Sequence, residues 1–312
     1  MSQRRSELDA AAIALMIILC ASWGFNQVAI KIANTGISPI LQAGLRSVGS
    51  ALLVWAWARW RGTPLFGRDG SLVLGTLVGV LFGAEFVFLY AGLQYTSASR
   101  AVLFLYMSPF VVALGAHWFI PGEKLRRLQG VGLLCAFAGM ALAFADALRF
   151  PSYRELLGDG MALIAAALWG ATTVIIKATR LRFLAPDKTL FYQLGASALL
   201  LPALSWASGE PGIVAPMPLV LAMLAYQILI VAFMTYLTWF WLISRYPAGR
   251  LSSFSFLTPL FGLIAGGVVL REPIGWSLLL ALLLVGIGIY LVNRVPAAPP
   301  AKALVSRLSR GK

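Results

Sequence analysis

Charged side chains are scarce in this sequence. Asp, Glu, Lys and Arg together make up 12% of its 312 residues, about half the share found in ordinary soluble domains. Hydrophobic residues make up 60%, and the mean hydropathy is +0.85. Only 11 acidic and 25 basic residues are present, too few to cover the two soluble domains that this length would suggest. The scarcity excludes a soluble enzyme, a secreted disulfide-rich protein and a disordered chain.

Histidine and cysteine are equally rare. His117 is the single histidine, so a catalytic triad or a histidine-based metal site has too few partners. Cys20 and Cys135 lie in apolar segments, where cysteine usually serves as a small hydrophobic side chain. The sequence also contains no Walker phosphate loop. We therefore expect no catalytic residues, no metal and no cofactor.

Long apolar segments dominate what is present. Charge clusters and Gly/Pro turns divide the chain into ten of them, each about 20 residues long, the length that crosses a bilayer as a helix. They cover residues 11–33, 37–58, 70–92, 98–120, 128–147, 157–179, 188–208, 217–243, 248–270 and 274–293. The sequence thus predicts an all-α polytopic membrane protein with ten transmembrane helices.

The basic residues orient these helices. Ten spans place both termini on one side, and 19 of the 25 basic residues fall on that side. Five fall on the other side, and Arg46 lies within the second span. Because cytoplasmic loops carry the excess of Lys and Arg, we expect both termini in the cytoplasm and the chain in a bacterial inner membrane. The net charge of +14 then reflects topology, and we expect no nucleic-acid partner. A basic cytoplasmic tail, 294–312, is expected to lie on the anionic leaflet.

The chain contains an internal repeat. Five features of the first half recur in the same order 146 to 150 residues later. They are Trp23-Gly24 and Trp169-Gly170, Lys31 and Lys177, Arg100 and Arg250, Ser108-Pro109 and Thr258-Pro259, and Glu123 and Glu272. Each repeat, 1–150 and 151–293, holds five spans, and because five is odd the second is inverted relative to the first. Inverted repeats are typical of alternating-access carriers, whose substrate site lies near the midplane.

These motifs resemble those of the drug/metabolite transporter superfamily, and within it the EamA-domain exporters. The resemblance covers about residues 10–293 and rests on Trp-Gly near the start of each repeat, Ser/Thr-Pro in the fourth span and Glu before the fifth. By overall similarity the nearest branch is the YddG-type aromatic amino-acid exporters. The resemblance implies a monomeric ten-helix carrier that exports its substrate. It also implies a central cavity lined by spans 1, 3, 4, 6, 8 and 9.

Arg46 and Glu85 are the charged residues expected well inside spans. Each costs about 2.5–3.5 kcal/mol at a helix centre, so each needs a partner or a wet cavity. At 1.5 Å per residue both lie about 10–14 Å below the outer surface, with Asn26 and Gln27 at similar depth. Two interpretations remain open: a structural ion pair, or a site that reads the carboxylate and ammonium of a zwitterion. A third is that Glu85 carries a coupling proton.

Aromatic side chains complete the expected site, because several fall in the spans that should line the cavity and can bury apolar substrate groups. The predicted substrate-binding residues are Trp23, Asn26, Gln27, Arg46, Glu85, Tyr90, Tyr106, Trp169, Thr173, Tyr236, Trp239 and Phe256. Pro109 and Pro259 should kink spans four and nine and act as paired hinges.

The expected function is a secondary transporter that exports amino acids, with aromatic and larger apolar ones favoured. The alternative within transport is a carrier of another small metabolite, such as a nucleobase, a sugar-phosphate or a drug-like compound. The alternative of a different class is a membrane enzyme or receptor module, which would need a clustered site in loops. The loops of this chain are short.

Overall fold

The computed structural model describes residues 7–67, 69–145, 150–271 and 277–294. Within these ranges the regular elements are helices, with one isolated antiparallel bridge between Ile37 and Ile213. The first repeat contains α1 (Ala10–Ala33), α2 (Pro39–Arg61), α3 (Leu72–Gly92), α4 (Ala98–Leu105), α5 (Ser108–Phe119) and α6 (Arg127–Ala143). The second contains α7 (Tyr153–Ala178), η2 (Arg180–Phe183), α8 (Pro186–Ala207), α9 (Pro218–Tyr226), η3 (Gln227–Thr235), α10 (Tyr236–Arg245), α11 (Ala248–Ser253), η4 (Phe254–Phe256), α12 (Leu257–Leu270) and α13 (Ser277–Arg294).

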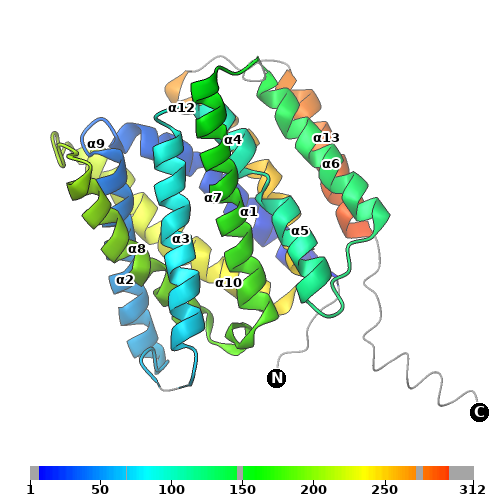
Figure 1. The fold of residues 1–312 in the computed structure, drawn as a ribbon, viewed down its shortest axis with the longest axis horizontal. Helices are drawn as coiled ribbons and strands as arrows, with labels where there is room; N and C mark the ends of the chain where they lie inside the picture. Colours follow the sequence, from blue (N-terminus) through cyan, green and yellow to red (C-terminus); the bar gives the residue numbers. More distant parts are fainter. Residues whose placement is uncertain (1–6, 68, 146–149, 272–276, 295–312) are drawn as a thin grey trace, which may run out of the picture.

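These elements form ten spans, seven continuous and three interrupted. In the described residues, eight helices are long and apolar enough to cross a membrane by length and composition. They include the joined pairs over 98–119 and 248–270 and the segment 218–245. Of the other two, α6 is a shorter apolar helix, and α2 has 23 residues but carries three arginines. The all-α polytopic fold predicted from the sequence is confirmed (Figure 1).

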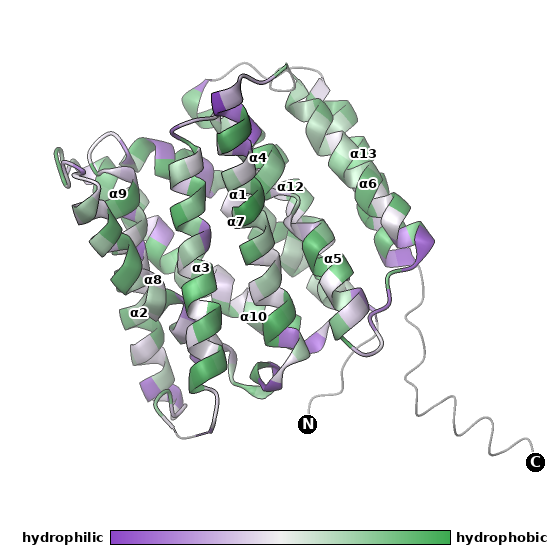
Figure 2. Ribbon diagram, viewed as in Figure 1, coloured by the Kyte–Doolittle hydropathy of each residue, from purple (hydrophilic) through white to green (hydrophobic). Residues whose placement is uncertain are grey.

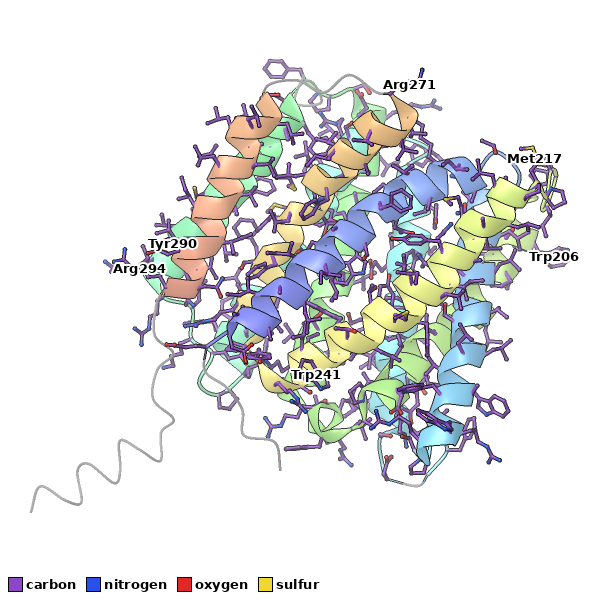
Figure 3. All side chains as sticks on the ribbon, turned by 180° about the vertical axis from the view of Figure 1, so that it is seen from behind. Trp206, Met217, Trp241, Arg271, Tyr290 and Arg294 are labelled. Atoms are coloured by element: carbon purple, nitrogen blue, oxygen red, sulfur yellow. The ribbon has the colours of Figure 1, made fainter. Side chains whose placement is uncertain are left out.

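The helix ends define two polar faces. We name the face where α1 begins, at Asp9, the A face, and the face where α1 ends, at Asn34, the B face. Figure 2 shows apolar residues along the helices and hydrophilic ones gathered toward these two ends. In Figure 3 the labelled residues Met217 and Arg271 lie at the B face, and Trp241 and Arg294 at the A face. Ten crossings return the chain to the A face.

Helix packing follows a two-fold relation between the repeats. The most extensively packed pairs include α6 with α13 and α2 with α8, each formed by corresponding spans of the two halves. The packing of α5 against α7 has its counterpart in that of α12 against α1, and the packing of α3 against α7 in that of α9 and η3 against α1. Exchanging the two repeats therefore maps observed pairs onto observed pairs, as the predicted inverted repeat requires.

The glycine of each Trp-Gly motif explains part of this packing. A Cβ added at Gly24 would lie 2.5 Å from the Cβ of Phe261 on α12. A Cβ added at Gly170 would lie 2.6 Å from the Cβ of Val111 on α5, at the equivalent position of the other repeat. Only glycine allows these backbones to approach so closely. The motif thus holds the first span of each repeat against the fourth span of the other.

Three spans are interrupted. The fourth breaks at Tyr106–Met107, before Ser108-Pro109, and the ninth passes through the 3₁₀ turn η4 before Thr258-Pro259. Proline removes a helical hydrogen bond, so these breaks agree with the predicted kinks. The eighth span contains the π-helix η3, which has no proline and was not predicted. Ser50 of α2 donates to the carbonyl of Ile228 there (3.1 Å), giving one backbone group of the π-helix a side-chain partner.

Eight spans form a ring around the site, and two lie outside it. Following the packed pairs around the ring gives α1, α9–α10, α2, α8, α3, α7, α4–α5 and α11–α12. Figure 1 shows α6 and α13 side by side at one edge of the molecule. The ring encloses a cavity at its centre, between the two repeats.

Candidate functional site

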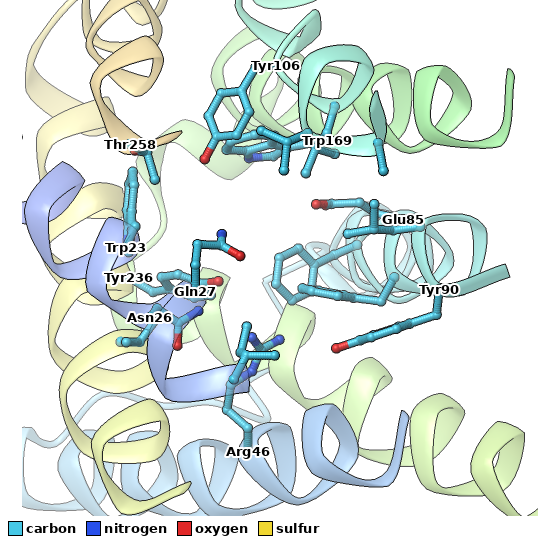
Figure 4. Close-up of a pocket in the computed structure, with 18 of the residues that line it drawn as sticks. Trp23, Asn26, Gln27, Arg46, Glu85, Tyr90, Tyr106, Trp169, Tyr236 and Thr258 are labelled. Carbon is cyan, nitrogen blue, oxygen red and sulfur yellow. The ribbon is translucent and has the colours of Figure 1, made fainter. Parts of the chain in front are cut away.

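The central cavity has a volume of about 240 Å³ and is lined by residues from both repeats (Figure 4). Eleven of the twelve predicted site residues line it. They are Trp23, Asn26, Gln27, Arg46, Glu85, Tyr90, Tyr106, Trp169, Thr173, Tyr236 and Trp239. The structure thus brings together side chains from α1, α2, α3, α7 and α10, and from the break between α4 and α5.

Arg46 and Glu85 face this cavity from α2 and α3 and are 3% and 6% exposed. The guanidinium of Arg46 lies 4.8 Å from the ring centroid of Phe86, within cation–π range. Arg46 Nε and Nη2 and Glu85 Oε2 are buried and have no hydrogen-bond partner among the described residues. The structure shows no ion pair within 4 Å between the two, so each charge remains available to a bound molecule.

Neutral polar groups also line the cavity. Figure 4 shows Asn26 and Gln27 on α1 between Trp23 and Arg46. The Oδ1 atom of Asn26 is buried without a hydrogen-bond partner. Thr173 lies on α7, where its hydroxyl donates to the carbonyl of Trp169 (3.5 Å). The cavity therefore offers donors and acceptors as well as both signs of charge.

Aromatic rings form two clusters around these polar groups. Trp23 makes edge-to-face contacts with Tyr236 and Trp239, at centroid distances of 6.3 and 5.8 Å. Its indole Nε1 donates to Thr235 Oγ1 at 2.8 Å, which fixes the ring. Across the cavity Tyr106 packs edge-to-face on Trp169 at 5.9 Å. The two tryptophans are repeat counterparts, and each aromatic cluster combines rings from both repeats.

Phe256 is the predicted site residue that does not line the cavity. It is fully buried and packs on Phe110 and Phe137, with centroid distances of 6.0 and 6.4 Å. The expectation rested on the span to which Phe256 belongs and not on a helical face, and this residue of η4 packs in the core. Two positions later, Thr258 reaches the cavity instead.

Other lining residues were missed. Phe82 and Phe86 lie on α3 and line the cavity. Phe82 is three residues before Glu85 and so shares its helical face, and an analysis of that face would have found it. Gln193 is the repeat counterpart of Arg46, and it lines the same cavity. For Gln193, the signal available in the sequence is the repeat.

A second cavity connects the site to the B face. It has a volume of about 580 Å³ and shares Gln27, Tyr90 and Tyr106 with the central one. Its remaining walls reach Asn34 and Glu210 at the B face. Pro259 lines this passage, whereas Pro109 is buried at the start of α5.

The A face is sealed below the central cavity. Glu123, in the loop before α6, forms an ion pair with Lys177 of α7 (3.0 Å) and accepts from the backbone N–H of Ala248 (2.8 Å). Lys177 also donates to the carbonyl of Tyr246, whose hydroxyl donates to Asp9 (2.9 Å). These contacts join α1, α7, the loop before α6 and the loop between α10 and α11. Among the described residues, the contacts named here close the A-face end, whereas the second cavity leads from the site to the B face.

Among the described residues, no group of three or more His, Cys, Asp or Glu could hold a metal ion. Glu272, the repeat counterpart of Glu123, lies outside the described residues, as does the expected basic tail beyond Arg294.

Comparison with known proteins agrees with this architecture. A family model described as the EamA-like transporter family matches residues 10–145 and again 156–294. The chain is 27% identical to an uncharacterized transporter of Bacillus subtilis, covering 93% of this chain and 94% of that one. It is 27% and 25% identical to probable amino-acid metabolite efflux pumps of Salmonella typhimurium and Escherichia coli, covering 89% of this chain and 93% of each.

A solved structure shares the fold. It superposes with a TM-score of 0.77 at 20% identity, covering 92% of this chain and 96% of that one. The family match spans both repeats, and the relatives are matched over nearly their whole length. The protein is a multi-pass membrane transporter, and it belongs to the EamA-like transporter family.

Proposed function

We propose that this transporter exports amino acids across the bacterial inner membrane as a monomer, by alternating access, and that it favours aromatic and larger apolar ones. The A face is assigned to the cytoplasm because the excess of Lys and Arg lies on that side of the chain. The direction is supported by the efflux named for the relatives in Salmonella typhimurium and Escherichia coli.

The observation that carries the proposal is the pair of unpartnered opposite charges in an aromatic cavity. A carboxylate bound at Arg46 and an ammonium bound at Glu85 would form charge-assisted hydrogen bonds, the strongest kind available to a small ligand. The substrate's side chain would then contact the rings of Trp23, Tyr236 and Trp169. An amino-acid zwitterion carries all three of these groups.

Alternating access is supported by the two-fold packing and by the asymmetry of the faces. The site is sealed at the A face and connected to the B face, in a fold whose halves are inverted copies. Exchanging the conformations of the two halves would open the A face and close the B face. A substrate bound at the centre would then pass from one side to the other.

The competing substrate class is a phosphorylated metabolite. A phosphate group is usually held by several cations or helix N-termini. Among the described lining residues of the central cavity, Arg46 is the single Lys or Arg. The cavity therefore suits a carboxylate better than a phosphate.

Counterflow in proteoliposomes tests the proposal. Vesicles preloaded with phenylalanine should accumulate labelled phenylalanine or leucine, and should not respond to preloaded uracil or glucose 6-phosphate. Trp169→Ala should weaken the exchange, whereas Trp206→Ala, at an 86% exposed position, should leave it unchanged. Folded protein that exchanges no amino acid would refute the proposal.

A further inference from the structure

The seal at the A face includes an apolar contact between the inner halves of spans four and nine. Val112, Ala116 and Ile120 of α5 form a buried cluster with Ala248 of α11. A Cβ built on Gly249 would lie 3.9 Å from the Cβ of Ala113. The contact consists of apolar side chains, several of them small, so the two helices approach closely here.

The repeat places equivalent residues at the B face. Spans four and nine correspond with a constant shift of 150 residues, as Arg100 with Arg250 and Pro109 with Pro259 show. With this shift, the counterparts of Val112, Ala113, Ala116 and Ile120 are Gly262, Leu263, Gly266 and Leu270. The counterparts of Ala248 and Gly249 are Ala98 and Ser99. All six of these counterparts line the cavity that leads to the B face.

We infer that Ala98 and Ser99 of α4 and the α12 face from Gly262 to Leu270 are the gate of the B face. They are separated in this structure by the passage that they line, and they meet when the A face opens. The inference rests on the alternating access proposed above. Specifically, Ser99 should contact Leu263 when the B face is closed, just as Gly249 contacts Ala113 in the present structure.

The side chains suit a contact that forms and breaks. Gly262, Gly266 and Ala98 add little bulk, so α4 and α12 can approach as closely as α5 and α11 do. No charged group lies among the six counterparts, so the contact between them would bury no charge of its own. The breaks at Tyr106–Met107 and at η4 separate α4 from α5 and α11 from α12, so each half can move by itself.

The opposite side of the ring is bonded at both faces, which restricts the opening to spans four and nine. At the B face Glu210 accepts from the backbone N–H groups of Ile40 and Leu41, at 3.0 and 2.9 Å. At the A face Lys188 pairs with Asp69 at 2.8 Å. These contacts connect α2 and α8 with the neighbouring loops, so this side can act as the fixed part of the ring.

Paired cysteines test the gate in a background with Cys20→Ser and Cys135→Ser. The A-face pair, Ala113→Cys with Gly249→Cys, has Cβ atoms spaced for a disulfide in the present structure, where Cβ distances of 3.5–4.5 Å are needed. The B-face pair, Ser99→Cys with Leu263→Cys, should form its disulfide only as the carrier turns. Oxidation of either pair should reduce counterflow at least about tenfold, because alternation is blocked, and reduction should restore it.

The outcomes separate the gate from the function. A carrier that exchanges amino acids but whose B-face pair does not cross-link, or still transports when cross-linked, overturns the gate and leaves the proposed function intact. Absence of exchange in the unmodified protein refutes the function itself.

A single cysteine gives a second measurement if the double variant fails to fold. Ser99→Cys should react with a membrane-impermeant thiol reagent at the B face in the resting carrier. It should react more slowly while substrate exchanges, because the gate then closes part of the time. An unchanged rate during exchange would also overturn the gate.

Discussion

Arg46 and Glu85 are the residues on which the transport proposal depends most directly. Their repeat counterparts are Gln193 and Thr235, so the two-fold relation that governs the packing does not extend to charge. Both charged side chains are almost fully buried, face one cavity and lack hydrogen-bond partners on the atoms named above. A charge retained in a membrane protein at such a cost usually has a functional partner, and in our proposal that partner is the substrate.

Glu85→Gln should weaken recognition of the substrate's ammonium group. Wild-type protein should prefer phenylalanine over 3-phenylpropionate, which lacks that group, and the variant should reduce this preference about tenfold. A charged hydrogen bond contributes about 1.5–3 kcal/mol, and 1.4 kcal/mol corresponds to a factor of ten. Competition in the counterflow assay measures the preference.

Arg46→Gln, which introduces the side chain found at Gln193, is the matched control. It should reduce the preference for phenylalanine over phenethylamine, which lacks the carboxylate, and leave the preference over 3-phenylpropionate unchanged. If both variants discriminate against the two analogues as strongly as the wild type does, these residues do not recognise the charged groups of the zwitterion.

The hydroxyl of Thr235 positions Trp23 and gives a second prediction. Thr235→Val keeps the shape but removes the acceptor of the indole N–H. Losing one such hydrogen bond costs about 0.5–1.5 kcal/mol, so KM for aromatic substrates should rise roughly two- to tenfold. Thr238→Val is the control, because its exposed hydroxyl bonds only to the carbonyl of Met234. Equal effects of both substitutions on KM would contradict the positioning role.

At the residue scale, the sequence predicted most of the cavity and erred where helix geometry changes. Helical depth predicted Asn26, Gln27, Arg46 and Glu85 at a similar level in the membrane, and all four line the central cavity. Phe256 was chosen because its span should line the cavity, and it packs in the core beside Phe110, in a 3₁₀ turn, instead. A short irregular turn is set by tertiary packing, which hydrophobic periodicity does not report.

At the scale of single elements, proline explains two of the three interrupted spans. Thr258-Pro259 and Ser108-Pro109 signal the breaks in the ninth and fourth spans. The π-helix η3 has no such signal, and the partner of its Ile228 carbonyl, Ser50, comes from another helix. Its location therefore depended on long-range contacts that the sequence does not display.

Pro109→Ala should slow transport without weakening substrate binding. Alanine would restore the backbone donor and favour a continuous helix through the break before α5. The exchange rate should fall several-fold while KM stays constant, since Pro109 does not line the central cavity. Pro259→Ala should behave alike. An exchange rate equal to that of the wild type would show that the prolines do not act as hinges.

Gly288→Val should destabilise the pair α6–α13. A Cβ at Gly288 would lie 2.5 Å from the backbone nitrogen of Ala136 and from the carbonyl oxygen of Gly132, so the helices would have to separate. Overpacking of this kind costs about 1–3 kcal/mol. Gly286→Val is the matched control, since nothing lies within 4 Å of its added Cβ. Thermal unfolding in detergent should show a lower midpoint only for Gly288→Val.

At the scale of the whole molecule, the sequence predicted the two inverted repeats but not the state that the fold adopts. The motifs of the two halves are equivalent, so they assign similar residues to both faces. Only the structure shows that Ala113 meets Gly249 at the A face, while Leu263 and Ser99 line an open passage. A symmetric pattern cannot indicate which of two equivalent gates is closed.

The ion pair Glu123–Lys177 should stabilise this state over the one open to the A face. Removing one partner of a buried ion pair costs about 3–5 kcal/mol. Because the Lys177 ammonium regains water when the A face opens, Glu123→Gln should shift the carrier toward the A-open state. A cysteine at Gly249, on the sealed contact, reports the shift: its labelling from the A side should become at least about tenfold faster, since 1.4 kcal/mol is a factor of ten.

The double substitution Glu123→Gln with Lys177→Gln separates loss of the pair from loss of one charge. It removes both charges of the pair, so labelling should return toward the wild-type rate, and the cycle of single and double variants gives the coupling between the two residues. Additive effects would mean that the pair does not control the A face. The seal would then depend on the apolar contact of α5 with α11, where the valine, alanines and isoleucine of that cluster are already packed.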